Sequence, residues 1–230
     1  MLFRSGAGCS HGHAQADNGI LQRSPAGQWS ALSNLSQWLL ANPGAKGAEQ
    51  PLARDYEPDG TWFSMVFELG RLYALEPNHG LLVSVHPELG TVELERDLFA
   101  TFGDHTYTTM ATYNGDLYIG TLGRIVQSFD ASIYRLSREG IAEVFATGLK
   151  AVLGLTFDRR GQLYAIQSPI FVPGTGSLVR VDQSGGHEVI VSGLTFPSAL
   201  TLGPDGALYV SVCGYHCQPG QGQILRIVVP

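Results

Sequence analysis

The chain of 230 residues has few charges, and they form no cluster of one sign. Only 15% of the residues are Asp, Glu, Lys or Arg, and the net charge is −6. Without a stretch rich in Lys and Arg, the sequence argues against nucleic acid as a partner. No apolar run reaches the roughly 18 residues that a membrane-spanning helix needs, so we expect no transmembrane segment.

Cysteine is also scarce. The three cysteines are too few for a disulfide framework, although Cys213 and Cys217 share one short loop. As a disulfide, this pair would be worth about 2 kcal/mol and would indicate an oxidising compartment, whereas free thiols would indicate nothing. We therefore expect a periplasmic or extracellular protein, with any signal peptide in a missing N-terminal part. The histidines and cysteines do not follow the spacing of a structural zinc site.

The common catalytic motifs are absent as well. The chain has no G-x-S-x-G elbow, no Rossmann fingerprint and no recognisable Ser-His-Asp arrangement. Apolar residues at helical spacing are nearly absent too. In their place are 29 glycines and 44% hydrophobic residues, a composition that suits a turn-rich all-β domain.

A repeated phrase gives the fold. An alternating apolar run, a turn and a second run ending in Leu-Tyr occurs four times, with its leucines 45, 46 and 45 residues apart. Two further apolar runs follow in each complete unit, the first of which begins near Leu82, Ile133 and Leu178. Four strands in 45 residues are typical of a blade of an antiparallel β-propeller. The leucines of the phrase are Leu72, Leu117, Leu163 and Leu208.

These units predict one β-propeller domain, which we read as an N-terminally truncated piece of a six-bladed protein. The chain would then form an incomplete arc of about four to five blades with about 17 strands. We expect a partial blade in residues 1–34, which contributes two strands, and a long loop over 35–62 that includes one short helix in 33–43. Whole blades then follow in 63–103, 104–148 and 149–193, and a partial last blade in 194–230.

Most of the unusual residues fall at one end of the strands. In a blade, the second-to-third loops and the crossings between blades lie at the same end, which we call the loop face. Five of the seven histidines and every cysteine are predicted there. Because loops on a rigid scaffold often carry function, we look for the site on this face. The candidate ligand-binding residues are His11, Asp59, Trp62, Glu76, Asn78, His79, His105 and His216.

Each candidate also has a plain structural interpretation. His79, in a turn-like context, is either a cap for backbone groups or a ligand or general base. Asp104 and His105 could form an acid–base pair, although adjacent residues in a strand point to opposite sides. The catalytic candidates are therefore His79, His105 and Asp104, and the candidate ligands for a divalent metal are His11, His79 and His105. The acids Asp55, Glu57 and Asp59 lack the calcium-loop pattern and read as a solvated turn.

Several phrases together resemble one family. "GAGCSHG", "NLSQWLLANP", "DYEPDGTWFSM", "LYALEPNHG" and "SGLTFPSALTLGPDGALYVSVCGY" are similar to the ScyD/ScyE family of bacterial propeller proteins, from about Gly6 to the end. The resemblance implies a six-bladed, often exported propeller without an established activity. It brings no catalytic assignment to the phrases around Asp59 and His79.

More distant resemblances are to NHL-repeat proteins and to metal-dependent gluconolactonase and phosphotriesterase propellers. The latter imply a divalent metal held by Glu, Asn, Asn and Asp at the inner strands. Here those strands open with Phe63 and Ser64, with Thr108 and Thr109, with Leu153 and Gly154, and with Ser198 and Ala199. These residues do not form such a ligand set.

We therefore expect an accessory propeller that binds a small molecule or a protein partner through the loop face. Two alternatives stay open. One is a metal-dependent hydrolase or lyase, and the other is a purely structural assembly module.

Overall fold

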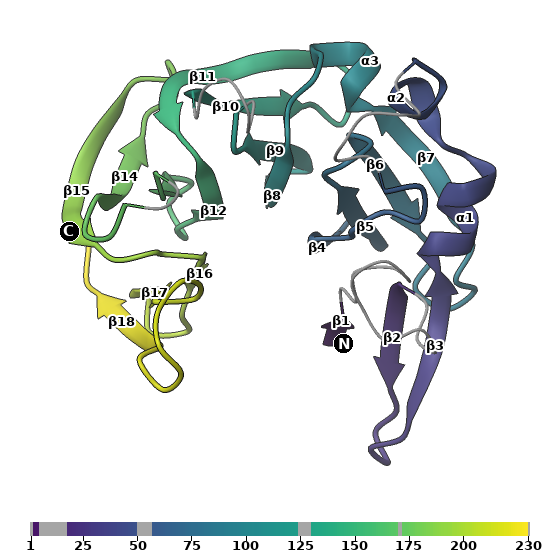
Figure 1. Ribbon diagram of the computed structural model, residues 1–230, viewed down its shortest axis with the longest axis horizontal. Helices are drawn as coiled ribbons and strands as arrows, with labels where there is room; N and C mark the ends of the chain where they lie inside the picture. The colour runs from purple at the N-terminus through teal and green to yellow at the C-terminus, as the bar shows by residue number, and fades with distance from the viewer. Residues whose placement is uncertain (1, 5–17, 50–56, 124–129, 170–171, 230) are drawn as a thin grey trace. The chain divides into compact units, whose positions relative to one another are not determined.

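The computed structural model describes residues 2–4, 18–49, 57–123, 130–169 and 172–229. The chain divides into two compact units, Met1–Tyr107 (unit 1) and Thr108–Pro230 (unit 2). Each unit is built from antiparallel sheets in which strands that follow one another in sequence also lie side by side (Figure 1). None of the helices in the described residues is long and apolar enough to cross a membrane.

Unit 1 contains a three-stranded sheet, a four-stranded sheet and short helices within its described residues. The strands of the first sheet are β1 (Leu2–Arg4), β2 (Gly19–Arg23) and β3 (Trp29–Asn34). The strands of the second are β4 (Ser64–Glu68), β5 (Arg71–Glu76), β6 (Leu81–Val85) and β7 (Val92–Asp97). The helices are α1 (Leu35–Ala41), α2 (Gly44–Glu49) and α3 (Leu98–Phe102).

Unit 2 contains two four-stranded sheets and a three-stranded sheet within its described residues. The first comprises β8 (Tyr107–Tyr113), β9 (Asp116–Thr121), β10 (Asp130–Leu136) and β11 (Ala142–Lys150). The second comprises β12 (Val152–Phe157), β13 (Leu163–Gln167), β14 (Gly176–Val181) and β15 (His187–Leu194). The last comprises β16 (Ala199–Leu202), β17 (Leu208–Val212) and β18 (Gln223–Ile227).

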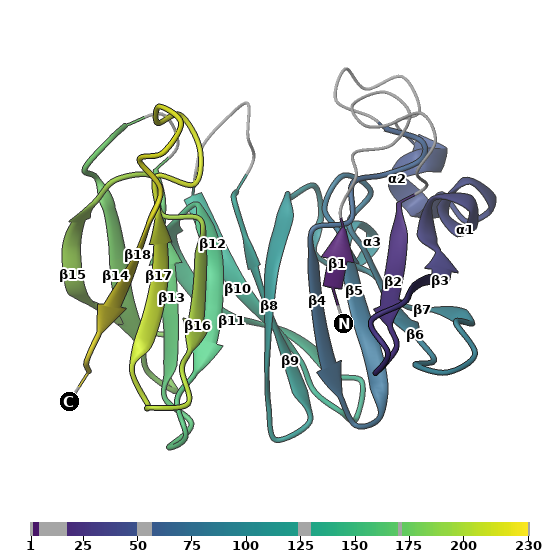
Figure 2. The same ribbon diagram turned by 90° about the horizontal axis from the view of Figure 1, so that it is seen from below.

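The repeated Leu-Tyr phrase forms the first hairpin of each sheet that carries it. The hairpins are β4–β5, β8–β9, β12–β13 and β16–β17. In each, the leucine is buried in the core, because alternate residues of a strand point to opposite faces of the sheet. Within unit 2, the β8–β9 and β16–β17 turns lie at one end of the strands and the β17–β18 loop at the other (Figure 2). The sequence predicts the same arrangement, with the second-to-third loops at one end of the strands and the first-to-second turns at the other.

The first sheet has one strand more than the two expected. Leu2–Arg4 pairs with Gly19–Arg23, from Leu2↔Leu21 to Arg4↔Gly19. The three-residue segment is too short to show an alternating pattern, so no strand was predicted there. The described residues therefore contain 18 strands instead of the 17 expected.

Two helices were also missed. The fourth strand of the first complete blade was expected to reach Leu98, but β7 ends at Asp97 and Leu98 begins α3. The Asp97 side chain caps this helix by accepting a hydrogen bond from the Ala100 backbone N–H at 2.8 Å, and it also accepts one from Ala45 N–H at 2.7 Å. Helix α2 lies in a stretch rich in Gly and Ala that carries no apolar periodicity.

In four of the sheets, the last strand lies at the sheet edge and contains a β-bulge where it pairs with its neighbour. The register shifts between β2 and β3, β6 and β7, β10 and β11, and β14 and β15. In each pair the outer strand holds the unmatched residue, and such a residue bends the strand and increases its twist. The unmatched residues at equivalent positions are Leu32, Glu95, Phe145 and Ile190.

Helix α1 covers part of the core of unit 1. Asn34 caps it by accepting a hydrogen bond from Gln37 N–H at 2.9 Å. Leu35 and Leu39 are fully buried and belong to the same apolar cluster as Trp62 and the inward-facing residues of β5 and β6. The one helix that was predicted thus lies where the long connection meets the core.

Candidate functional site

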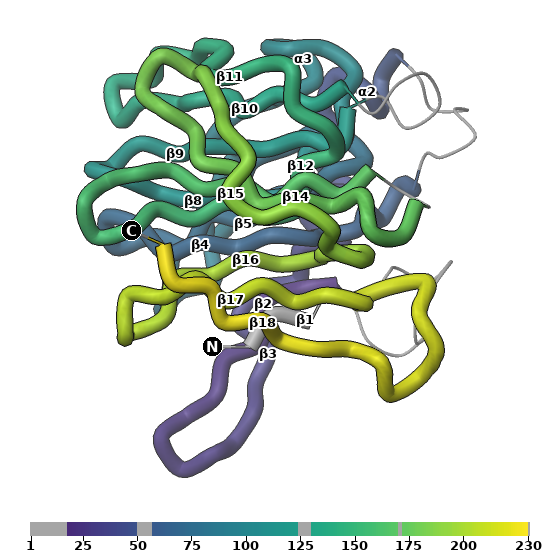
Figure 3. The backbone as a smooth tube through the Cα atoms, turned by 90° about the vertical axis from the view of Figure 1, so that its left-hand side faces the viewer, coloured from purple at the N-terminus to yellow at the C-terminus, as the bar shows by residue number. Residues whose placement is uncertain are grey.

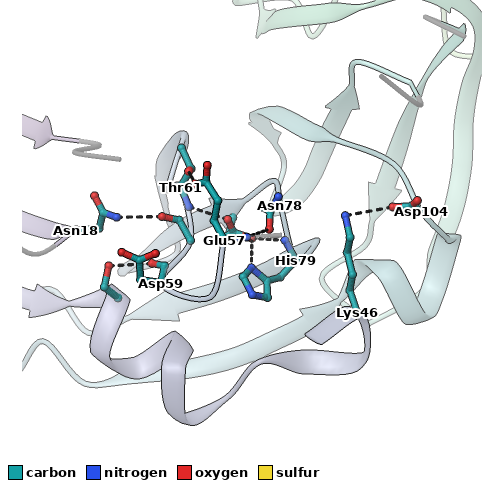
Figure 4. Close-up of polar contacts among 11 residues, drawn as sticks. Asn18, Lys46, Glu57, Asp59, Thr61, Asn78, His79 and Asp104 are labelled. Carbon is teal, nitrogen blue, oxygen red and sulfur yellow. Dashed lines mark hydrogen bonds and ion pairs between the residues drawn. The ribbon is translucent and has the colours of Figure 1, made fainter. Parts of the chain in front are cut away.

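Within unit 1, the buried carboxylate of Glu76 holds the turn at residues 57–62 against the β5–β6 loop. Glu76 ends β5 and has no solvent exposure. Its Oε1 accepts a hydrogen bond from Thr61 N–H at 2.8 Å, and its Oε2 accepts one from the His79 backbone N–H. The Nδ1 atom of the His79 ring lies 3.0 Å from the same Oε2. The carboxylate therefore links the 57–62 turn to the β5–β6 loop (Figure 4).

Asn78 and Glu57 tie the same two segments together. The Oδ1 atom of Asn78 accepts a hydrogen bond from Glu57 N–H at 2.9 Å, and Thr61 Oγ1 donates to the Glu57 carboxylate. Glu57 is partly buried, so the turn is less solvated than the acidic residues alone suggested. The phrases "EPDGTW" and "EPNHG", 19 residues apart, thus form one hydrogen-bonded substructure.

The first sheet and α1 support the turn from the other side. Asn18 donates from Nδ2 to the carbonyl oxygen of Gly60 at 3.0 Å. Ser36, in the first turn of α1, donates from Oγ to the carbonyl oxygen of Asp59 at 2.9 Å. The contacts fix the backbone of the turn on both sides (Figure 4).

Two buried polar atoms beside this turn have no hydrogen-bond partner among the residues that the structure describes. They are Oδ1 of Asn18 and Nε1 of Trp62, and both residues are fully buried. Buried polar atoms are paired in most proteins, and an exception marks a place where water or a ligand could complete the hydrogen bonding.

Asp104 and His105, a candidate acid–base pair from the sequence, each contact a further residue. Asp104 forms an ion pair with Lys46 of α2, with Nζ and Oδ1 3.4 Å apart, and the Lys46 side chain is 7% exposed against 48% for Asp104. The His105 ring packs edge-on to Tyr107, with ring centroids 6.1 Å apart. Adjacent residues here face different partners, so Asp104 connects α2 to the segment before β8.

In unit 2, Cys213 and Cys217 form a disulfide in the β17–β18 loop, with Cα atoms 5.4 Å apart. The loop extends beyond the strand ends of its sheet (Figure 3). His216 lies within it, exposed, and its ring packs against Phe196 and Tyr215 at centroid distances of 5.6 and 5.3 Å. An open cavity of about 630 Å³ runs along this loop and the end of β15.

We expect the double variant Cys213→Ser/Cys217→Ser to lower the free energy of unfolding of unit 2 by about 2 kcal/mol, because the short closed loop loses its constraint in the unfolded chain. Urea denaturation followed by hydrogen exchange of the β17 and β18 amides measures the change. Adding a reductant should lower the stability of the parent protein by the same amount and leave the variant unaffected. Equal stability of the parent and the variant without reductant would contradict a stabilising role.

The structure brings together part of the predicted set. Asp59, Trp62, Glu76, Asn78 and His79 gather around one turn of unit 1. His216 belongs to unit 2, while His11 and Asp55 lie outside the described residues. His79 is fully buried, which favours the structural interpretation of this histidine over a role as general base.

Sequence reasoning missed several contributors to the site, among them Ser36, which donates a hydrogen bond to the Asp59 carbonyl oxygen. Asn18, Thr61 and Lys46 make hydrogen bonds or ion pairs to segments far away in the chain. Of these three, only Thr61 had a local signal, since it lies within the "EPDGTW" phrase. Among the described residues, no three His, Cys, Asp or Glu side chains group in a way that could hold a metal ion.

Comparison with known proteins identifies the fold. No family model matches the sequence, and no curated protein matches it either. Among solved structures, a gluconolactonase-like protein is similar at 16% identity with a TM-score of 0.58, over 91% of this chain and 70% of its own. The chain is a β-propeller.

Two further solved structures resemble this propeller. One is a chain of the nidogen–laminin complex, at 16% identity and a TM-score of 0.56, over 73% of this chain and 65% of its own. The other is the PQQ-bound aldose sugar dehydrogenase from Streptomyces coelicolor, at 15% identity and a TM-score of 0.59, over 72% and 59%. The propeller thus spans between 59% and 70% of these three chains, and identities this low show the fold alone.

Proposed function

We propose that this chain is an accessory, exported propeller of the ScyD/ScyE type that binds a small molecule or a protein partner through its loop face. The observation that carries the proposal is the hydrogen bonding that holds the turn at residues 57–62 in unit 1. Glu76 and Asn78 accept hydrogen bonds from residues 57–62, a neighbouring segment of the chain. His79 in turn contacts the Glu76 carboxylate. Such contacts suit a preorganised recognition surface, because a prearranged loop loses little entropy on binding.

The unpartnered polar atoms support a ligand at this turn. Trp62 Nε1 can only donate a hydrogen bond and Asn18 Oδ1 can only accept one. A ligand with both an acceptor and a donor could satisfy the two atoms. The disulfide between Cys213 and Cys217 supports export, since such bonds persist in oxidising compartments.

A metal-dependent hydrolase is the alternative function, favoured by the similarity to a gluconolactonase-like propeller. The inner strands of this chain open with side chains that include the half-exposed Phe63 and the buried Thr108 and Thr109. Hard divalent cations prefer carboxylate and amide oxygens, and these positions supply none.

Elemental mass spectrometry of the purified protein, combined with hydrolysis assays, distinguishes the two functions. We expect no hydrolysis of δ-gluconolactone or of a phosphotriester in the presence of Ca²⁺, Mn²⁺ or Zn²⁺. A thermal-shift screen with a panel of small sugars and amino acids tests the binding proposal. We expect it to reveal a ligand that stabilises the parent protein. The same ligand should not stabilise Trp62→Phe, which lacks the ring N–H. Turnover that a chelator abolishes would replace the binding proposal with the hydrolase.

A further inference from the structure

A second candidate site lies at the opposite end of the strands from the loop face, within unit 2. A cavity of about 300 Å³ is lined by residues of β8–β11 and by residues of β12–β15. A polar cavity of about 290 Å³ adjoins it, and Gly161 and Gln183 line both. Cavities of a few hundred Å³ with apolar walls and few polar groups are the usual sites for small molecules.

The walls of the first cavity are aromatic. Tyr113 stacks on Phe157 with ring centroids 4.9 Å apart. Tyr118 meets both Phe157 and Phe145 edge-on, at 4.8 and 5.1 Å. Tyr113, Phe145 and Phe157 are only partly buried, so each keeps some surface for a ligand. Edge-on and stacked contacts with a further ring are favourable in such a group.

The residue at the β11 bulge distinguishes this blade from the one that follows it. Phe145 is the unmatched residue of the bulge, and it lines the cavity. Bulges commonly change the direction of a side chain next to a binding site. In the sheet that follows, the equivalent unmatched residue is Ile190, which has no ring.

At one edge of the aromatic cavity, carboxylates balance the positive charge of Arg135. Arg135 forms ion pairs with Asp116 at 2.7 Å and with Glu143 at 2.9 Å. Burial raises the pKa of Tyr118, and its hydroxyl is therefore a neutral donor near pH 7. These groups supply hydrogen-bonding atoms to the cavity without giving it a net positive charge.

The adjoining cavity presents two arginine side chains. Arg160 and Arg180 line it together with one carboxylate, that of Asp158. Asp158 is buried, and its Oδ1 accepts hydrogen bonds from the backbone N–H groups of Arg160 and Gln162, at 2.8 and 2.9 Å. The arginine side chains are partly or largely exposed, at 40% for Arg180 and 71% for Arg160. Arg180 forms an ion pair with Glu188, and Arg160 forms one with Asp158 at 3.6 Å. Ion pairs at exposed guanidinium groups are weak, so an anionic ligand could exchange with these carboxylates from solvent.

We propose that these adjoining cavities form a binding site for a small aromatic carboxylate, with its ring against the exposed parts of Tyr113, Phe145 and Phe157 and its carboxylate toward Arg180. Guanidinium groups recognise carboxylates through paired N–H donors. The site is separate from the turn around Glu76 in unit 1, so it is independent of the function proposed above.

Ligand-observed saturation-transfer NMR with phenylacetate, at millimolar concentration, tests the site. We expect phenylacetate to bind more tightly than cyclohexylacetate, which has no ring electrons, and more tightly than phenethylamine, which carries the opposite charge. Phe145→Ile introduces the residue type found at the equivalent position, Ile190, of the next sheet. Phe145→Ile and Arg180→Gln should each weaken phenylacetate binding by about tenfold. Gln183→Glu, at an exposed position of the shared wall, should weaken it through charge repulsion.

Arg226→Gln is the matched control. Arg226 lies opposite Tyr209 in the last sheet, as Arg180 lies opposite Tyr164, and it lines neither cavity. It should leave phenylacetate binding unchanged. The proposal is overturned if phenylacetate does not bind the parent protein, or if Gln183→Glu and Arg180→Gln, with unchanged circular dichroism, bind it as well as the parent does.

Discussion

Replacing Glu76 with alanine should lower the free energy of unfolding of unit 1 by about 3 to 5 kcal/mol, since it removes one partner from a buried, charged hydrogen-bond group. The backbone N–H groups of the partly buried Thr61 and the fully buried His79 would lose their acceptor. Glu76→Gln should cost less, about 1 to 3 kcal/mol, because one oxygen remains while the new amide N–H₂ faces existing donors.

Tryptophan fluorescence measures this change in unit 1 alone. All three tryptophans, Trp29, Trp38 and Trp62, belong to that unit, so a urea titration reports its unfolding. Glu93→Ala is the control, because Glu93 forms an exposed ion pair with Arg71 at 2.8 Å and is 63% exposed. Exposed pairs contribute at most about 1 kcal/mol. An unchanged midpoint for Glu76→Ala would show that the carboxylate does not hold the turn.

Gly60→Ala should strongly destabilise the turn at the candidate site. Gly60 has φ +71°, where a side chain costs about 1–2 kcal/mol. A Cβ atom there would lie 2.3 Å from Cδ2 of Leu39 and 3.1 Å from Oε1 of Glu76. Because Leu39 is fully buried, it has little room to move, and such overpacking adds about 1–3 kcal/mol.

Gly70→Ala separates backbone strain from crowding. Gly70 has φ +81° in the β4–β5 turn, and a Cβ atom there would meet nothing within 4 Å. It should therefore lose only the backbone contribution, about 1–2 kcal/mol. The comparison uses the same fluorescence titration. Equal losses for the two variants would mean that the turn moves away from Leu39 and Glu76, which contradicts a rigid turn.

Much of the fold follows from one repeated phrase. The Leu-Tyr hairpins recur at a nearly constant spacing and place a leucine in the core each time, so alternation of apolar residues was enough to locate them. Alternation of apolar residues carries little information where a strand is very short or where a short capped helix follows the strand directly. Leu2–Arg4 and the α3 helix were missed for this reason, since pairing with β2 and capping by Asp97 determine them.

The candidate site was predictable only in part. The phrases around Asp59 and His79 stood out as unusual loops, and the structure joins them through Glu76 and Asn78. Asn18 and Lys46 gave no comparable signal, because their partners lie 42 and 58 positions further along the chain. The burial of His79 also depends on packing that no local pattern records.

The bulges in the outer strands have a consequence for solubility. Strands β7, β11 and β15 are sheet edges, and each exposes an apolar residue, namely Leu94, Val144 and Val189, which are at least half exposed. A straight edge of this kind can pair with a strand of another molecule and seed aggregation. The unmatched residue interrupts the ladder next to each of these side chains, so a foreign strand would find few consecutive hydrogen-bonding partners.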